Sequence, residues 1–174
     1  MFGGFDLLSQ NSRSAISYAG GGCALNSMRV FQWLSGDMKR SVFLGGLGMD
    51  DNRDVLDNLV KNDGVLTSFA LNKDLPTGHC IALANGDERT LCANLVVAEK
   101  YETSDLWFDK NLALLKNIQV IYVEGYFMSH SFETTMELTS FARSNNITLV
   151  FNLCGEYFCE DISYVKNVLK FMFS

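Results

Sequence analysis

Two runs of apolar residues, each followed by a helical pattern, constrain the fold of this chain more than any other feature. Residues 120–123 and 147–151 are continuous apolar strands, and 132–143 and 162–171 carry apolar residues at helical spacing. Strands of this kind separated by helices are typical of a parallel sheet covered by helices on both faces. The sequence therefore predicts an α/β core in which both strands are buried.

The first half of the chain adds alternating strands to this scheme. Helices are predicted at 23–34 and 52–61, and strands at 14–19, 42–44, 65–71, 80–84 and 89–96. Gly45, Gly46 and Gly48 are expected to close the strand at 42–44. The stretch Asn-Gly-Asp-Glu-Arg at 85–89 is a strong hairpin signal. We therefore expect a small antiparallel flap on the parallel core.

Composition excludes several classes of protein. The 174 residues suffice for one domain, and their net charge of -6 argues against nucleic acid as a partner. No stretch approaches the roughly 20 apolar residues of a membrane span, and the first residues do not resemble a signal peptide. The five cysteines include no Cys-x-x-Cys pair, so packed thiols are expected and neither a disulfide framework nor a metal site.

Three consecutive glycines, residues 20–22, precede the helix predicted at 23–34. They match no phosphate loop, since neither G-x-x-x-x-G-K-[ST] nor G-x-G-x-x-G after a strand is present. Asn26 would lie in the first helical turn, beside exposed backbone N–H groups. A carboxamide in that position suits the vicinal hydroxyls of a sugar. On spacing alone, a tight turn with a helix-start asparagine remains the favoured interpretation.

The second strand of the predicted hairpin alternates in character. Its alternation places Arg89, Leu91, Ala93 and Leu95 on one face, and Thr90, Cys92, Asn94 and Val96 on the other. The first face is a flat apolar strip that could cover an aromatic base while the arginine reaches an anion. From these residues alone, an ordinary half-buried strand with a solvent-exposed arginine is favoured.

The remaining polar residues are weaker candidates. His79 and His130 are isolated in the sequence, and a packed or surface role is the more common one for such histidines. Asp50 and Asp51 precede the helix at 52–61, where acidic residues usually cap the helix.

Five segments in order resemble the adenosine kinases, within the ribokinase-like family of sugar and nucleoside kinases. They are AGGGCALNSMRVFQWL, FLGGLGMDDNRDVL, PTGHCIALANGDERTLCANLVVAEKY, VIYVEGYFMSHS and TLVFNLCGEYF, which run from about residue 18 to residue 158. The Gly-Gly-x-x-x-Asn pattern is moderately specific for the wider family. The segment beginning PTG is the one that indicates an adenosine kinase.

The resemblance implies a fold and an activity. Residues 1–174 would form a single, incomplete ribokinase-like domain, with lid strands at about 14–20 and 65–96 and an α/β core at about 23–62 and 105–174. Its sheet would be parallel, with flanking helices and a small antiparallel β lid. The family reaction is ATP-dependent phosphorylation of adenosine to AMP in purine salvage, assisted by Mg²⁺.

The resemblance also implies residue roles. Ribose hydroxyls would be held by Gly21, Gly22 and Asn26. The apolar lid and wall around adenine would be formed by Cys80, Leu91, Ala93, Leu95 and Phe127. Arg89 would move in with the lid to steady the transferring phosphate.

The sequence also departs from the family pattern. The family's opening strand with N-x-x-x-D, its N-x-x-E motif near magnesium and phosphate, and its G-A-G-D motif, which carries the general base, have no counterparts at the corresponding places. Gly155 and Glu156 stand where the family tends to have a small residue and proline. The expectation is a chain that retains the adenosine and lid half without the ATP half, and so is inactive alone. No metal-binding residue is assigned.

Expectations for partners and location follow the same resemblance. The partner would be adenosine or a related nucleoside, with no nucleic acid and no membrane. The family is usually monomeric, but we expect this chain to self-associate through its unfinished sheet. Its location would be cytoplasmic, with the nucleus as a further compartment. A sugar kinase relative and a non-catalytic, nucleoside-binding or regulatory fragment stay open as alternatives.

Overall fold

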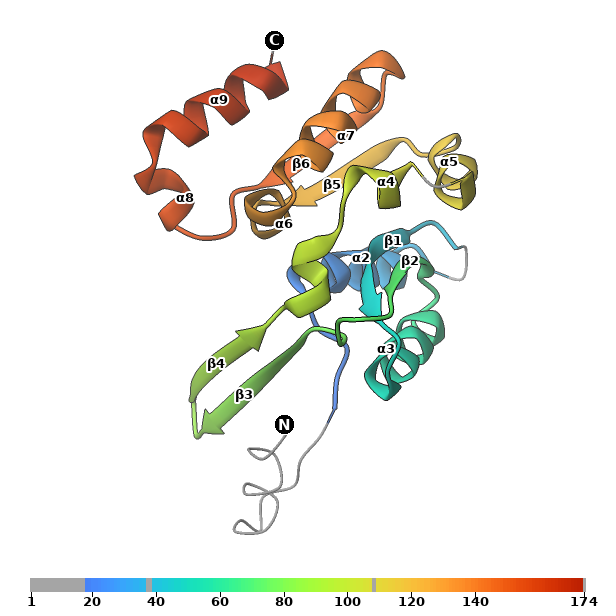
Figure 1. The fold of residues 1–174 in the computed structure, drawn as a ribbon, viewed down its shortest axis with the longest axis vertical. Coiled ribbons are helices and arrows are strands. Elements are labelled where there is room, and N and C mark those ends of the chain that lie inside the picture. The colour runs from blue at the N-terminus through green and yellow to red at the C-terminus, as the bar shows by residue number, and fades with distance from the viewer. Residues whose placement is uncertain (1–17, 37–38, 108, 174) are drawn as a thin grey trace.

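Two pairs of parallel strands and one antiparallel hairpin organise the chain (Figure 1). The computed structural model describes residues 18–36, 39–107 and 109–173. Within these ranges β1 pairs with β2, β3 with β4 and β5 with β6, in three separate two-stranded sheets. Helices flank both parallel pairs, so the α/β fold class with a small antiparallel sheet is confirmed.

Two helices pack on the first parallel pair through one shared core. β1 (Val42–Gly48) continues into α3 (Asp51–Asn62) and returns as β2 (Leu66–Asn72), in a register that pairs Val42 with Leu66 and Gly48 with Asn72. α2 (Cys23–Leu34) packs on this unit. Their shared core consists of Leu25, Val60 and Val65, with Met28, Phe43 and Leu56 packed against it.

The second parallel pair contains the larger core. β5 (Val120–Glu124) and β6 (Thr148–Asn152) are connected by α6 (Gly125–His130) and α7 (Phe132–Ser144), and α8 (Tyr157–Glu160) and α9 (Ile162–Phe173) follow. α4 (Thr103–Leu106) and α5 (Asp109–Leu115) lead into this unit. Its buried cluster comprises Tyr101, Leu106, Leu115, Ile121, Val123, Leu138 and Ala142.

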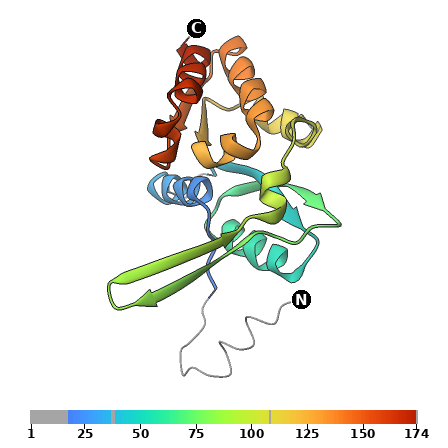
Figure 2. The ribbon, with the colours of Figure 1, turned by 60° about the vertical axis from the view of Figure 1, so that its left-hand side comes forward.

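The hairpin extends away from both parallel pairs, as Figures 1 and 2 show. It consists of β3 (His79–Asn85) and β4 (Glu88–Asn94), and the 3₁₀ helix η1 (Val96–Lys100) returns the chain to the body. Gly86 begins its two-residue loop with φ 61°, a conformation that glycine adopts without steric cost. Every residue of β4 is exposed.

Most of the predicted elements are confirmed. The structure contains the helices predicted at 23–34, 52–61, 132–143 and 162–171, and the strands at 65–71, 80–84, 89–96, 120–123 and 147–151, with ends that differ by at most two residues. The strand predicted at 14–19 falls largely on residues outside the described ranges, and Tyr18, Ala19 and Gly20 lie in no strand. The region expected to be a lid, 65–96, is divided, because β2 pairs in parallel with β1 and the hairpin begins at His79.

The prediction that glycines close the strand at 42–44 was wrong. β1 runs through Gly45, Gly46 and Gly48 and keeps its pairing with β2 to the end. A Cβ atom on Gly48 would lie 2.5 Å from the backbone oxygen of Leu75, and one on Gly46 would lie 3.0 Å from the backbone oxygen of Val97. Glycine occurs inside this strand because neighbouring backbone approaches it closely.

The prediction that 120–123 and 147–151 are fully buried was also wrong. Val120 at the start of β5 is 55% exposed, and β6 alternates between half-buried and exposed residues. The continuous apolar pattern therefore marked parallel strands correctly but overstated their burial. In the described part of the chain, no helix combines the length and apolar character needed to cross a membrane.

Candidate functional site

The start of α2 presents backbone amides without a side-chain cap. Gly22 is the N-cap residue, with φ 108° that strongly favours glycine, and no side chain accepts from the first turn. A Cβ added to Gly21 would meet no atom within 4 Å, so there is open space beside this backbone. Asn26 lies in the first turn and is exposed.

Arg29 orders this segment. Its Nη1 donates to the Gly20 oxygen at 3.0 Å and to Asn26 Oδ1 at 3.2 Å, and its Nε pairs with Asp63 after α3. The Asn26 carboxamide oxygen is therefore engaged, which directs its NH₂ group away from Arg29. Sequence reasoning did not identify Arg29, because its role depends on α3 returning beside α2.

The hairpin has two exposed faces. The register pairs Cys80 with Ala93, Ala82 with Leu91, and Ala84 with Arg89, so these residues share one face. Leu91 on this face is 57% exposed, whereas Cys92 lies on the opposite face, paired with Ile81. The predicted apolar strip therefore exists in register, with Arg89 toward the tip of the hairpin.

Leu95 does not continue that strip. β4 ends at Asn94, and Leu95 adopts helical backbone angles (φ -80°, ψ -27°) as the residue before η1. Val96 follows with φ 44°, an unfavourable conformation for a β-branched residue. The strict alternation predicted for 89–96 therefore holds only as far as Asn94.

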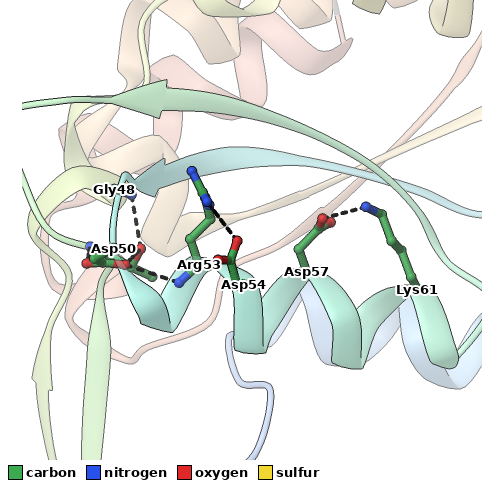
Figure 3. A network of polar contacts seen from close by, with 7 residues as sticks. Gly48, Asp50, Arg53, Asp54, Asp57 and Lys61 are labelled. Carbon is green, nitrogen blue, oxygen red and sulfur yellow. Dashed lines mark hydrogen bonds and ion pairs between the residues drawn. The ribbon is translucent and has the colours of Figure 1, made fainter.

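The connection from β2 to the hairpin is held by Asp50. Thr77 donates its backbone N–H to Asp50 Oδ2 at 2.7 Å and its hydroxyl to Asp50 Oδ1 at 2.7 Å. The hydroxyl oxygen of Thr77 accepts the Gly48 N–H at 3.0 Å. Asp50 Oδ1 also accepts the Arg53 N–H at the start of α3 (Figure 3). Asp50 caps α3 as predicted, and it also binds Thr77, which the sequence analysis missed.

These hydrogen bonds affect the titration of Asp50. Partial burial acts to raise its pKa, but the hydrogen bonds from Thr77 and Arg53 outweigh burial and lower the pKa below its usual value of 3.8. The carboxylate is thus ionised at neutral pH and acts as an acceptor through both oxygens.

Phe127 lies in α6, at the carboxyl end of β5. Its ring packs edge-on against Tyr101, with ring centroids 5.8 Å apart. Burial, together with the Asp105 carboxylate, raises the pKa of Tyr101 to about 12. Phe127 is partly buried and packs against the core cluster that contains Tyr101.

A second polar group joins the carboxyl ends of β5 and β6. Glu124 is 4% exposed, accepts the Tyr122 hydroxyl at 2.7 Å and accepts the Cys154 thiol. Burial and this bond to Glu124 raise the pKa of Cys154, so the thiol stays protonated and is a poor nucleophile. No sequence signal identified this pair, because its members are thirty residues apart.

The structure places the predicted site residues on three separate elements. Gly21, Gly22 and Asn26 begin α2, while Phe127 lies in α6. Cys80, Arg89, Leu91 and Ala93 lie on the hairpin. Figures 1 and 2 both show the segment before α2 passing beside the base of the hairpin.

One small cavity lies on another side of the hairpin base. It measures about 40 Å³ and is bordered by Gly46, Asn72, Val97 and Tyr101, among others. This volume holds roughly one or two water molecules and is too small for a sugar or a nucleoside. The residues predicted to bind a ligand lie instead at the start of α2, on the hairpin and in α6.

Comparisons with known proteins show which family this chain resembles. The profile of the pfkB family of carbohydrate kinases matches residues 7–163. Adenosine kinase from Dictyostelium discoideum is 26% identical over 163 residues, which cover 91% of this chain and 48% of that protein. Adenosine kinase from Schizosaccharomyces pombe is 32% identical over 144 residues, covering 82% of this chain and 42% of that protein.

Solved structures give the same result. Anopheles gambiae adenosine kinase, in complex with P1,P4-di(adenosine-5) tetraphosphate, superposes with a TM-score of 0.80 at 31% identity, over 90% of this chain and 45% of that one. Schistosoma mansoni adenosine kinase with adenosine has a TM-score of 0.85 at 19% identity, over 96% and 48%, which shows the fold. This chain spans about half the length of the curated relatives it matches.

Proposed function

Since the chain belongs to the pfkB family of carbohydrate kinases, we propose that it serves as the nucleoside-binding part of an adenosine kinase. The family reaction transfers the γ-phosphoryl group of ATP to the adenosine 5′-hydroxyl and gives AMP and ADP. In this proposal the chain supplies the surfaces that bind adenosine. The expected cytoplasmic location belongs to the same proposal.

The observation that carries the proposal is the exposed hairpin face. Cys80, Leu91 and Ala93 form a small-residue apolar strip that touches little of the chain's own core. Apolar surface that stays exposed among the described residues favours a ligand over a purely structural role. A purine base is flat and apolar on both faces, so this strip and Phe127 suit its two sides, with Leu95 at the hairpin base.

The ribose is assigned to the start of α2. Gly21 and Gly22 leave room for a ligand to approach the uncapped amides, and the Asn26 carboxamide lies one turn further on. Arg29 holds the Asn26 oxygen, so the NH₂ group remains to donate to a vicinal hydroxyl. Neutral hydroxyls suit this donor set better than a phosphate group.

Arg89 is assigned to the phosphate. It shares the face of Leu91 and Ala93, nearer the tip of the hairpin, so closure of the hairpin would bring a cation toward the transferring group. A fixed cation stabilises charge that develops during phosphoryl transfer.

ATP and Mg²⁺ are the co-substrate and metal that the family implies. In the ranges that the structure describes, no three His, Cys, Asp or Glu side chains are grouped so as to hold a metal ion. No residue is therefore assigned to Mg²⁺, and no step is derived through it.

The binding proposal is tested by titrating adenosine into the purified chain in a calorimeter, with ribose as competitor. A saturable adenosine isotherm that ribose does not displace supports a nucleoside site. Displacement by ribose at comparable concentration would favour the sugar kinase alternative. No heat with adenosine at millimolar concentration would overturn the proposal.

A second measurement concerns turnover. The reaction needs a base for the 5′-hydroxyl proton and an anion hole, and this sequence lacks the G-A-G-D motif that supplies both in the family. Loss of a base alone costs about 10²–10⁴-fold, so AMP formation from labelled adenosine and Mg·ATP should stay near background. Turnover of about 1 s⁻¹ or more would show a catalytic group that we have not identified.

A further inference from the structure

The two connections between the hairpin and the body differ in how they are held. The incoming connection contains Thr77, whose backbone and side chain are both bonded to Asp50. The outgoing connection contains Val96, which adopts an unfavourable positive φ of 44°. The hairpin is thus fixed at one connection and strained at the other.

Close packing at two glycines reinforces the incoming connection. A Cβ on Gly48 would lie 2.5 Å from the Thr77 nitrogen, and a Cβ on Gly78 would lie 2.5 Å from the Leu95 oxygen. The two connections therefore touch each other at Gly78, and the incoming one also touches β1. A shift of Thr77 would be transmitted to β3 directly, because Gly78 immediately precedes it.

Asp50 does more than a helix cap requires. A cap needs one oxygen to accept from the first turn, and Asp50 Oδ1 accepts the Arg53 N–H at 3.1 Å. Its other oxygen, Oδ2, accepts the Thr77 N–H at 2.7 Å. Thr77 is 3% exposed, so its groups in these part-buried bonds have little access to water and favour one position of the connection.

We propose that Asp50, acting through Thr77, is a positioning residue that sets the position of the hairpin face relative to the start of α2. Asp50 touches no substrate in this arrangement; it orients Gly78 and β3, and thereby the strip of Cys80, Leu91 and Ala93. The effect on ligand binding rests on the proposed function, whereas the effect on hairpin position does not.

The test measures hairpin position directly. Spin labels are placed on α3 and at the hairpin tip by Asn58→Cys and Asp87→Cys, in a chain whose five cysteines are replaced by serine. Pulsed electron paramagnetic resonance then gives the distribution of distances between the labels. Thr77→Val keeps the size of the side chain but removes its hydroxyl, and we expect a distribution about twice as wide.

Three further variants control this result. Thr77→Ser retains the hydroxyl and should restore the narrow distribution. Asp54→Asn changes an exposed carboxylate on the same helix, paired with Arg53, and should have no effect. Asp50→Asn keeps the cap but cannot accept the Thr77 N–H through its NH₂ group, so it should widen the distribution as well. If Thr77→Val does not fold by circular dichroism, Asp50→Asn decides the question.

Adenosine affinity is measured separately in chains with native cysteines. We expect Thr77→Val to weaken binding about tenfold and Thr77→Ser to restore it, since a tenfold change corresponds to about one hydrogen bond. If the distance distributions of Thr77→Val and Asp50→Asn are as narrow as that of the unchanged chain, the proposed positioning role of Asp50 is wrong. If none of the chains binds adenosine, the proposed function is wrong. The widths of the distance distributions would still test whether Asp50 positions the hairpin.

Discussion

The hairpin and the β5–β6 unit both carry apolar strand residues, but in opposite environments. In β5, Ile121 and Val123 are buried in the largest cluster of the molecule, with α4, α5 and α7 contributing to it. In β4, all seven residues are exposed, although Leu91, Cys92 and Ala93 are as apolar as a core sequence. The same kind of residue therefore stabilises the fold in one region and contributes little to it in the other.

This difference means that binding and folding can be separated by mutation. Free energy of unfolding should depend on the β5–β6 unit, because burial of apolar surface is the main stabilising contribution. Affinity for a ligand should depend on the hairpin, whose apolar side chains remain available.

The largest expected effect breaks the β5–β6 core. Leu106 is 1% exposed and belongs to its cluster, so Leu106→Ala should lower the free energy of unfolding by about 2–5 kcal/mol. The matched change Leu91→Ala on the hairpin should stay within about 0.5 kcal/mol. Urea denaturation followed by circular dichroism measures both. Equal losses would mean that the hairpin packs on the body in solution.

The next effect concerns the two faces of the hairpin. Ala93→Asp places a charge on the strip with Cys80 and Leu91 and should weaken adenosine binding more than about 100-fold, because the carboxylate would be desolvated against the base. Cys92→Asp places the same charge on the opposite face and should leave affinity nearly unchanged. Calorimetric titration compares them. Similar losses in both variants would contradict the assignment of the faces.

A smaller effect is expected at the start of α2. Asn26→Ala should weaken adenosine binding by about 1–3 kcal/mol, the cost of one lost hydrogen bond to a ligand hydroxyl. Ser27→Ala, at the next position, removes only a hydroxyl that donates to the Cys23 backbone, and it serves as the control. If Asn26→Ala changes neither the adenosine affinity nor the melting temperature, residues 21–26 form only a turn and do not bind the ligand.

The smallest effect is a pH dependence at the hairpin base. The folded-state pKa of Asp50 lies below 3.8, so its contribution to stability is present above that pH and is lost as the pH falls through the lowered value. At pH 7 the free energy of unfolding of the unchanged chain should exceed that of the Asp50→Asn variant by about 1 kcal/mol. The gap should close at an acidic pH below this lowered pKa, where a protonated Asp50 resembles asparagine. Urea midpoints at both pH values measure it, and a gap that persists in acid would exclude titration of Asp50 as its source.

Much of the fold could be predicted because local patterns were strong. The hairpin followed from Asn85 and Gly86 between alternating strands, and β5 and β6 from continuous apolar runs. The extent of β1 could not be predicted, because Gly45 and Gly46 are usual strand breakers. Here they lie in the strand for a reason that only the fold reveals, the approach of the Val97 backbone.

In the candidate site too, some residues could be predicted from local sequence patterns and others could not. Asn26 and the Leu91–Ala93 strip came from spacing within a single element, and the structure retains that spacing. Asp50, Arg29 and Glu124 act through partners twenty-seven or more residues away, so no local pattern contained their roles. The end of the strip at Asn94 was missed because the strand gives way to η1, with Val96 at a positive φ.

Substitutions of the glycines should be depleted for different reasons in a library of all single substitutions. The library would be selected for nucleoside kinase activity in a completed enzyme. At Gly48 every replacement collides with the backbone of Leu75 and Thr77, so depletion there would report on folding. At Gly21 an added methyl group meets only open space, so the free chain should tolerate alanine. Depletion of Gly21→Ala under selection, with normal abundance of the protein, would therefore record a collision with the ligand itself.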